Sequence, residues 1–372
     1  MMFDFGFKIE KGVLKEYKGK KKSVFIPKSV HTIAPEAFIC NEVMESVTIP
    51  ESVSVIGNDA FAVCNNLASV SIPDSVRIIG NGAFRDCRGL MRIYVGRGVT
   101  DIRSGAFSNC PNLVSIVVSE ENQFFKTVSD HLYSASGTML LRYAAKSHSS
   151  EFLIPDGVTF VDSGAFSGCS SLRRVVVPEG VTHLQAAFRG CVSLKSLVLP
   201  TTAINFSDRA FEGCNELEEI ALPEGTGLIG SYMFAYCRGL RSISLPGSIT
   251  SIGASAFCNC LSLKNITIPG GVTEIGTDAF GGCSSLESAV MNEGLTKIDK
   301  YAFRWCKRLK CVTLPKSLNE IDQYAFKDCS ALTSVTYLGA VAEWNSVIRR
   351  AGWNDNTGCY TVHCTDGDVK KD

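Results

Sequence analysis

The fold is decided by a stretch that reads FAVCNNLASVSIPDSVRIIG at residues 61–80. The same pattern recurs on both sides of it, and its first residue returns at near-constant intervals. Most intervals are 23 residues, one is 22, and one of 59 separates Phe107 from Phe166. The series is Phe38, Phe61, Phe84, Phe107, Phe166, Phe188, Phe211, Phe234, Phe257, Phe280, Phe303 and Phe326. A period sustained over most of a chain predicts a repeat solenoid, in which each repeat buries its apolar face against its neighbours.

Each repeat contains an alternating apolar segment, L-x-x-V-x-I at residues 67–72. Alternation with a period of two predicts a short strand with one buried face. Pro73 follows at once and ends strand pairing, because proline has no amide hydrogen to donate. A second apolar pair, Val76 and Ile79, is then expected to turn inward.

A tight turn is expected directly after this second pair. The position is glycine or aspartate in most repeats, and both residue types tolerate positive φ. We therefore predict positive φ at Gly57, Gly80, Gly230, Gly253, Gly276, Asp162, Asp299 and Asp322.

The chain should coil once per repeat and lay each strand beside the preceding one. Fourteen segments fit the strand pattern, from residues 24–26 to residues 335–337, and no long amphipathic helix interrupts them. The predicted fold is a repeat solenoid with a long parallel β-sheet of short strands, a 23-residue period and little helix. The aligned Phe residues should form a structural ladder through its core.

Composition excludes several classes of protein. The chain has 372 residues, is 45% hydrophobic, and carries 37 basic and 37 acidic residues. Disordered chains have low hydrophobicity and a charge imbalance, and neither is present. A neutral balance does not favour nucleic acid as a partner. No apolar run approaches the ~18 residues of a membrane span, so membrane insertion is not expected.

The repeat A-F-x-x-C-x-x-L-x-x-V-x-I-P-x-x-V-x-x-I-G resembles that of the BspA-like leucine-rich-repeat proteins. Residues 12–19 resemble the opening strand pair of that family, and residues 119–150 resemble its occasional hairpin repeat. Residues 343–345 and 362–367 resemble its C-terminal cap. The resemblance implies a leucine-rich-repeat coil and, from the few described members, a role in adhesion or protein binding.

These observations predict one cooperative solenoid with a cap at each end. The expected boundaries are an N-terminal cap at 1–22, a solenoid at 23–337 with an irregular hairpin-bearing insert at 119–150, and a C-terminal cap at 338–372. The 59-residue interval is interpreted as an ordinary repeat plus this insert. Lysines in the first cap should oppose edge-to-edge strand pairing.

Eleven of the sixteen cysteines follow a ladder Phe by three residues. A disulfide series and a thiolate metal site are the functional alternatives, but an odd count cannot pair fully and stacked side chains point in parallel. Their spacing also offers none of the close pairs typical of zinc sites. We expect reduced, buried thiols that fill a constant slot. They are Cys64, Cys87, Cys110, Cys169, Cys191, Cys214, Cys237, Cys260, Cys283, Cys306 and Cys329.

No arrangement typical of an enzyme is found. The histidines (His31, His131, His148, His183 and His363) occupy unrelated repeat positions, and no phosphate loop or metalloprotease motif is present. Cys359, His363 and Cys364 offer three metal ligands but lack a fourth. We therefore expect no catalytic residue, no metal and no cofactor.

The two signals for localisation disagree. The N-terminus lacks the pattern of a secretion signal, and the cysteines suit a reducing compartment, which together favour the cytoplasm. The family resemblance instead implies a secreted or cell-surface protein.

A candidate partner site lies on the outward face of the predicted sheet. Most outward residues are small or polar, but five neighbouring strands in the middle of the sheet carry apolar ones: Tyr94, Val117, Leu153, Val176 and Val198. Arg92 and Arg174 lie in the adjoining column and are expected to steer a partner. An exposed apolar patch with a charged border is typical of an interaction site. Strand propensity alone also explains such residues, and the 119–150 hairpin is an alternative cover for them.

Two functions remain open at this point. One is a non-enzymatic interaction module, adhesin-like or scaffold, that binds a protein of unknown identity on its sheet face. The other is a passive structural spacer or accessory segment without a specific site. A spacer should present monotonous small polar residues, whereas a binder should interrupt them.

Overall fold

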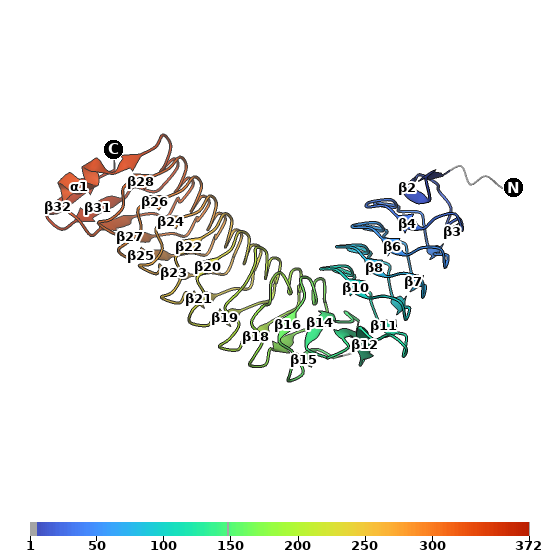
Figure 1. The fold of residues 1–372 in the computed structure, drawn as a ribbon. Helices are drawn as coiled ribbons and strands as arrows, with labels where there is room; N and C mark the ends of the chain where they lie inside the picture. The colour runs from blue at the N-terminus through green and yellow to red at the C-terminus, as the bar shows by residue number, and fades with distance from the viewer. Residues whose placement is uncertain (1–5, 147–148, 372) are drawn as a thin grey trace. The chain divides into compact units, whose positions relative to one another are not determined.

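A computed structural model describes residues 6–146 and 149–371, so His148 lies outside the described residues. The chain divides into two compact units. Unit 1 comprises Met1–Leu172 and Leu184–Cys191, and unit 2 comprises Arg173–His183 and Val192–Asp372. Each unit is a β-solenoid, in which one turn of the coil corresponds to one sequence repeat (Figure 1).

Unit 1 contains a five-stranded parallel sheet built from the predicted strands. Its register follows the repeat, so that Ser69 pairs with Arg92, and Ser71 with Tyr94. Within each strand the residues alternate between buried and exposed, as the sequence predicts. The strands are β3 (Ser23–Phe25), β5 (Ser46–Thr48), β7 (Ser69–Ile72), β9 (Arg92–Val95) and β11 (Ser115–Val118).

A second parallel ladder runs along unit 1, formed by the second residue of the inward apolar pair, such as Ile79, and the residue before it, such as Ile78. These strands are mostly two residues long, too short for alternation to reveal them, and the sequence analysis did not predict them. The ladder is β2 (Val13–Tyr17), β4 (Thr32–Ile33), β6 (Val55–Ile56), β8 (Ile78–Ile79) and β10 (Asp101–Ile102). At its end β1 (Phe7–Glu10) pairs antiparallel with β2, within the predicted N-terminal cap.

The 119–150 segment of unit 1 forms antiparallel strands. They are β12 (Phe125–Val128), β13 (His131–Ser134) and β14 (Met139–Arg142). β14 pairs in parallel with β16 (Phe160–Val161) and so returns the chain to the second ladder. The remaining strand of the unit, β15 (Glu151–Leu153), carries the sheet-face pattern.

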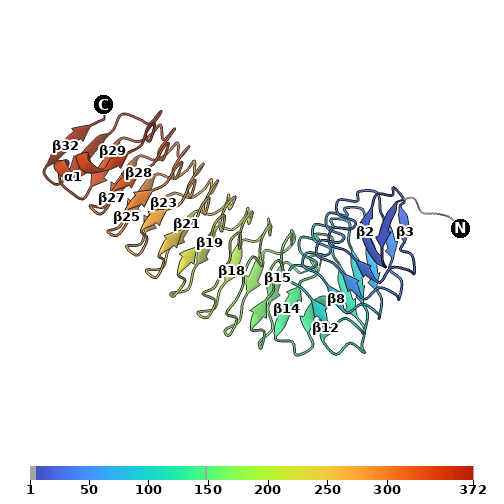
Figure 2. The ribbon, with the colours of Figure 1, turned by 45° about the horizontal axis from the view of Figure 1, so that its top comes forward.

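Unit 2 repeats the same plan over more turns, and Figure 2 shows β19, β21, β23, β25 and β27 following one another along one face. Its sheet-face strands are β17 (Arg174–Val176), β18 (Ser196–Val198), β19 (Glu219–Ala221), β21 (Ser242–Ser244), β23 (Asn265–Ile268), β25 (Ser288–Met291), β27 (Cys311–Leu314) and β29 (Ser334–Tyr337). Its second ladder is β20 (Leu228–Ile229), β22 (Ser251–Ile252), β24 (Glu274–Ile275), β26 (Lys297–Ile298), β28 (Glu320–Ile321) and β30 (Ile348–Arg349). Each of the fourteen predicted strands is thus present.

The C-terminal residues add a short helix and a hairpin to unit 2. The helix is α1 (Val341–Ser346), and the hairpin pairs β31 (Thr361–Cys364) with β32 (Gly367–Lys370). β31 also pairs in parallel with β29, so the hairpin continues the sheet. None of the helices in the described part of the chain is long and apolar enough to span a bilayer.

The ladder phenylalanines form the core of both units. Phe61 and Phe84 stack with ring centroids 5.0 Å apart and planes 2° from parallel, and Phe303 and Phe326 do so at 5.2 Å and 3°. Between Phe107 and Phe166 the insert supplies Tyr143, whose ring lies 5.3 Å from that of Phe166. The ladder is therefore not built from Phe alone.

The predicted positive φ at the turn glycines and aspartates is wrong. None of those eight residues has positive φ; the left-handed corners lie elsewhere in the repeat, for example at Asp59 and Val63. Glycine is required at position 57 for another reason, because a Cβ there would lie 2.5 Å from the backbone N of Pro35 in the preceding turn. A Cβ at Gly80 would likewise lie 2.5 Å from the backbone N of Asn58. Glycine is therefore needed at these positions because successive turns of the coil stack closely.

Candidate functional site

The predicted partner patch begins on strands β9 and β11 of unit 1. Val117 pairs in register with Tyr94, and Ser115 with Arg92. Alternation buries Ile93 in the core and leaves Tyr94 40% and Val117 49% exposed. Arg92 is exposed beside them. Two apolar side chains thus lie next to each other on the outer face of the sheet, with a guanidinium at their border.

The 119–150 hairpin does not bury these side chains. It lies beside β11, where the Ile116 amide donates to the Asp130 carbonyl (3.1 Å) and the Val118 amide to Thr127 Oγ1 (2.8 Å). The hairpin therefore occupies the place at the edge of β11 that the sequence analysis assigned to β15. Leu153 on β15 is 68% exposed, but its strand is not the hydrogen-bonded neighbour of β11.

The hairpin enlarges the apolar surface of unit 1. Phe124, just before β12, is 50% exposed, and Val128, the last residue of β12, is 42% exposed. Ser115 Oγ donates to Asp130 Oδ1 at 2.6 Å, which ties the hairpin turn to the Arg92 column of the sheet. The sequence analysis did not assign these residues to the patch, because the hairpin lacks the repeat period that places a side chain.

The remaining predicted patch residues lie on β17 and β18 of unit 2. Val176 pairs in register with Val198, and Arg174 with Ser196. Val198 is exposed and Val176 is half-buried, while Arg174 is exposed. Further along the unit the same face is polar, with Ser288 Oγ donating to Asn265 Oδ1 (2.7 Å) and Lys310 Nζ to Glu287 Oε2 (2.9 Å).

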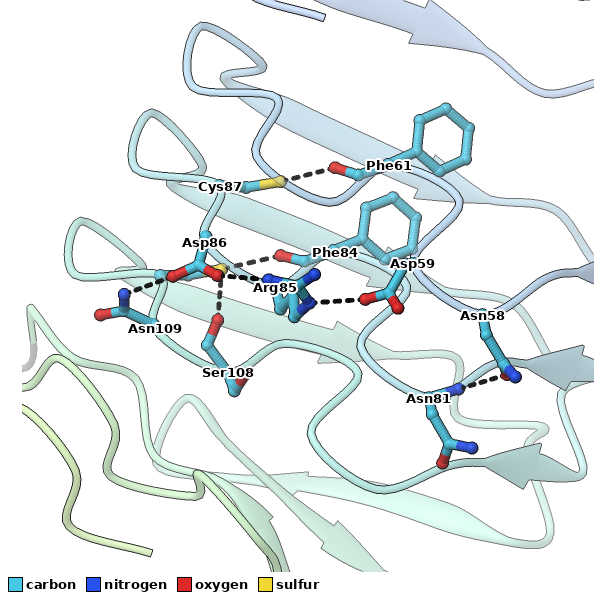
Figure 3. Close-up of polar contacts among 11 residues, drawn as sticks. Asn58, Asp59, Phe61, Asn81, Phe84, Arg85, Asp86, Cys87, Ser108 and Asn109 are labelled. Carbon is cyan, nitrogen blue, oxygen red and sulfur yellow. Dashed lines mark hydrogen bonds and ion pairs between the residues drawn. The ribbon is translucent and has the colours of Figure 1, made fainter. Parts of the chain in front are cut away.

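The ladder cysteines belong to the core. All eleven are fully buried, and none of the sixteen cysteines, which all lie among the described residues, forms a disulfide. The Cys87 thiol donates to the Phe61 carbonyl of the preceding turn at 3.1 Å, and the Cys283 thiol to that of Phe257 at 3.1 Å (Figure 3 shows the first). Burial raises the pKa of the Cys237 thiol to about 12. These thiols tie successive turns together and are poor nucleophiles.

Polar contacts join neighbouring turns at some of the corners on either side of the ladder Phe (Figure 3). Arg85 Nε donates to Asp59 Oδ1 of the preceding turn (2.5 Å), and Asn109 Nδ2 to Asp86 Oδ1 (2.5 Å). In unit 2 Arg304 Nε donates to Asp278 Oδ1 at 2.6 Å, the same pairing at the same repeat positions. Sequence reasoning missed these contacts, because each joins residues of two neighbouring repeats, as Arg85 and Asp59 do, and is not visible within a single repeat.

The histidines among the described residues contact other protein groups, for example His131 and His363. His131 is buried and its Nδ1 accepts the Ala144 amide hydrogen (3.1 Å), and His363 Nδ1 lies 2.9 Å from Asp368 Oδ1. Over residues 6–146 and 149–371, no three His, Cys, Asp or Glu side chains converge as metal ligands. The arrangement of Cys359, His363 and Cys364 therefore remains an incomplete ligand set.

Comparison with known proteins identifies the repeat. The BspA type leucine rich repeat region matches residues 8–136, 143–260 and 227–348, in six copies. No curated protein matches the chain.

Solved structures of bacterial repeat proteins share the fold. A leucine-rich repeat protein from Eubacterium ventriosum is 25% identical, with a TM-score of 0.55 over 90% of this chain and 76% of that one. One from Bacteroides ovatus is 23% identical, with a TM-score of 0.53 over 91% and 83%. The pneumococcal vaccine antigen PcpA is 17% identical, with a TM-score of 0.51 over 93% and 80%. Because the family match covers most of the sequence, the chain belongs to the BspA type leucine-rich-repeat proteins, a family of non-enzymatic repeat proteins.

Proposed function

We propose that the chain is a protein-interaction module whose partner docks on the sheet face. In unit 1 the proposed contact residues are Tyr94, Val117 and Leu153, with Arg92 steering the partner. In unit 2, taken by itself, they are Val176 and Val198, with Arg174. The observation that carries the proposal is the exposed pair Tyr94 and Val117, in register on neighbouring strands. Exposed apolar residues bordered by a guanidinium are typical of the centre and rim of a protein interface.

The family supports a role in binding at a cell surface. Repeat proteins of this kind are typically interaction or surface proteins, and one protein of the same fold is a pneumococcal vaccine antigen. We propose a secreted or surface-attached module that binds a protein partner. The cytoplasm remains the alternative location.

A passive spacer is the second candidate, favoured by the sheet face of unit 2. On β19, β21 and β23 the outward residues are small, namely Ala221, Ser244 and Thr267, and offer no large apolar anchor. A spacer accounts for that region, whereas it does not account for Tyr94 and Val117.

The two candidates are separated by quantitative pull-down with the full chain as bait. Val117→Asp places a charge in the centre of the patch, and Thr48→Asp places the same charge in the same column of β5, outside it. The interaction module predicts that Val117→Asp loses specific partners that wild type and Thr48→Asp retain. Identical partner lists for all three baits, with unchanged unfolding midpoints, would contradict the interaction module and favour the passive spacer.

A further inference from the structure

A cleft opens on the flank of unit 2, away from the sheet face. It has a volume of about 570 Å³ and is lined by Asn259, Gly282, Ser284, Trp305, Lys307, Asp328, Ser330 and Asn356. The volume falls within the roughly 300–1,000 Å³ typical of small-molecule sites. All of these residues come from the corners that follow a ladder Phe, or from the turn before the C-terminal hairpin.

The cleft exists because one corner lacks a side chain. Asn259, Gly282 and Trp305 occupy the same position in three successive repeats, two residues after the ladder Phe. Gly282 has φ of +73°, and a Cβ there would lie 2.5 Å from Asn259 Oδ1. Glycine therefore leaves room for the Asn259 amide between the turns.

Trp305 is the largest side chain at this corner. Its backbone is left-handed, with φ of 63°, as at the same corner of other repeats such as Tyr236, with φ of 62°. The side chain is 47% exposed. An exposed indole that lines a cleft is a reason to infer a binding function.

Polar contacts hold the indole in one orientation. Its Nε1–H donates to Asp328 Oδ2 at 3.1 Å, and Asp328 Oδ1 accepts from Asn356 Nδ2 at 2.9 Å. The Arg304 guanidinium lies 4.3 Å from the ring centroid and is itself fixed by Asp278, at 2.6 and 2.9 Å. A platform prepared in this way loses little entropy when a ligand packs on it.

The chemistry of the lining identifies the class of ligand. One face of the indole lies under the Arg304 guanidinium, and the other offers a flat apolar surface. Asn259 Nδ2 donates to Cys258 Sγ and Asn356 Nδ2 to Asp328, so the amide oxygens and the hydroxyls of Ser284 and Ser330 supply most of the remaining hydrogen-bonding groups. One lysine and one aspartate balance the charge. A ligand that fits must have an apolar face and many uncharged hydroxyl groups at its rim. We infer that this cleft binds a neutral oligosaccharide, with one sugar ring packed on Trp305.

The test is titration of the full chain with three neutral trisaccharides: maltotriose, cellotriose and triacetylchitotriose. Indole fluorescence and calorimetry are the readouts, since Trp344 is buried and Trp353 half-buried. Binding of at least one trisaccharide is expected, with a loss of affinity of about tenfold or more in Trp305→Ala. Tyr236→Ala is the matched control, because Tyr236 has the same repeat position and is 41% exposed but does not line the cleft.

Three results would overturn the inference. One is no binding of any of the three sugars at about 10 mM, beyond which affinity is negligible. Another is equal affinity in wild type and Trp305→Ala. The third comes from a fourth titration, with anionic 3′-sialyllactose. Binding of this sugar and of none of the neutral ones would indicate attraction to Lys307 and Arg304 by charge. The unfolding midpoint of each variant verifies that the fold is intact.

Discussion

The ladder cysteine shows why one residue type recurs in the repeat. Its side chain is small enough for the slot beside the Phe ladder, and its thiol donates to a carbonyl of the preceding turn, as Cys306 does to Phe280 at 3.2 Å. Alanine would lack this donor, although the Phe280 carbonyl also accepts the Cys283 amide hydrogen (3.2 Å). Sequence reasoning predicted the burial but treated the thiol as an apolar filler, because a contact between turns is invisible in a single repeat.

The ladder thiols should resist alkylation in the native protein. Burial raises the pKa of Cys64 and of Cys237 to about 12, so near pH 8 almost none of either is thiolate. Mass spectrometry after iodoacetamide treatment should find exposed Cys311 labelled and the eleven ladder cysteines unlabelled, with all labelled after denaturation. Ladder peptides labelled as fast as Cys311, or bridged between turns, would contradict this.

Truncating a ladder phenylalanine should destabilise unit 2 strongly. Phe280 is fully buried between Phe257 and Phe303, with ring centroids 5.0 Å from each. Phe280→Ala should lower the free energy of unfolding by about 3–5 kcal/mol, measured by urea denaturation. Tyr236→Ala, which removes an exposed ring, should cost less than ~1 kcal/mol. Similar costs for the two variants would be inconsistent with a stacked core.

At the scale of elements, the hairpin insert is the least regular part of the chain. Arg142 at the end of β14 is 1% exposed, and its guanidinium donates to the carbonyls of Gly164 (2.7 Å), Ala165 (3.2 Å), Ser167 (3.0 Å) and Cys110 (3.3 Å). This one side chain connects the turn before the insert to the turn after it. The insert is thereby fixed within unit 1.

The insert should also make unit 1 sensitive to acid. Burial lowers the pKa of His131 to about 4, against its ordinary value of 6.5. Between pH 6.5 and 4 this imidazole therefore binds a proton in the unfolded chain but not in the folded chain. The free energy of unfolding falls as the pH drops from about 6.5 towards 4. Urea unfolding should show this loss in wild type and less of it in His131→Gln, whose amide oxygen can still accept from Ala144. Parallel pH profiles for the two proteins would refute the assignment.

Regular elements could be predicted from the sequence, and irregular ones could not. The period fixed which residues of 67–72 face inward, and alternation assigned Tyr94 and Val117 to the outward face, where they lie. The place of the hairpin beside β11 was missed, because the 107–166 interval contains no repeat to set its register. The Trp305 cleft was missed because it depends on Gly282 lacking a side chain, a property of three neighbouring turns together.

At the scale of the molecule, stability should come from stacking between adjacent turns rather than from any single repeat. The expectation that residues 23–337 unfold as one cooperative solenoid stays a prediction. Hydrogen exchange measured across a urea series tests it peptide by peptide. Loss of protection in β7 and in β25 at one denaturant concentration is the expected result, and two separate transitions would contradict it.

The central claim is that the sheet face binds a protein through the exposed Tyr94 and Val117 pair. The most direct measurement is site-specific photo-crosslinking, with a benzophenone side chain at position 117 and, as the control, at position 48 of the same outward column. Irradiation is carried out in the presence of cells of the source organism and, separately, of cells from its natural surroundings. Discrete protein adducts are expected at position 117 and none at position 48. The absence of adducts at both positions, or the same adducts at both, would contradict the claim.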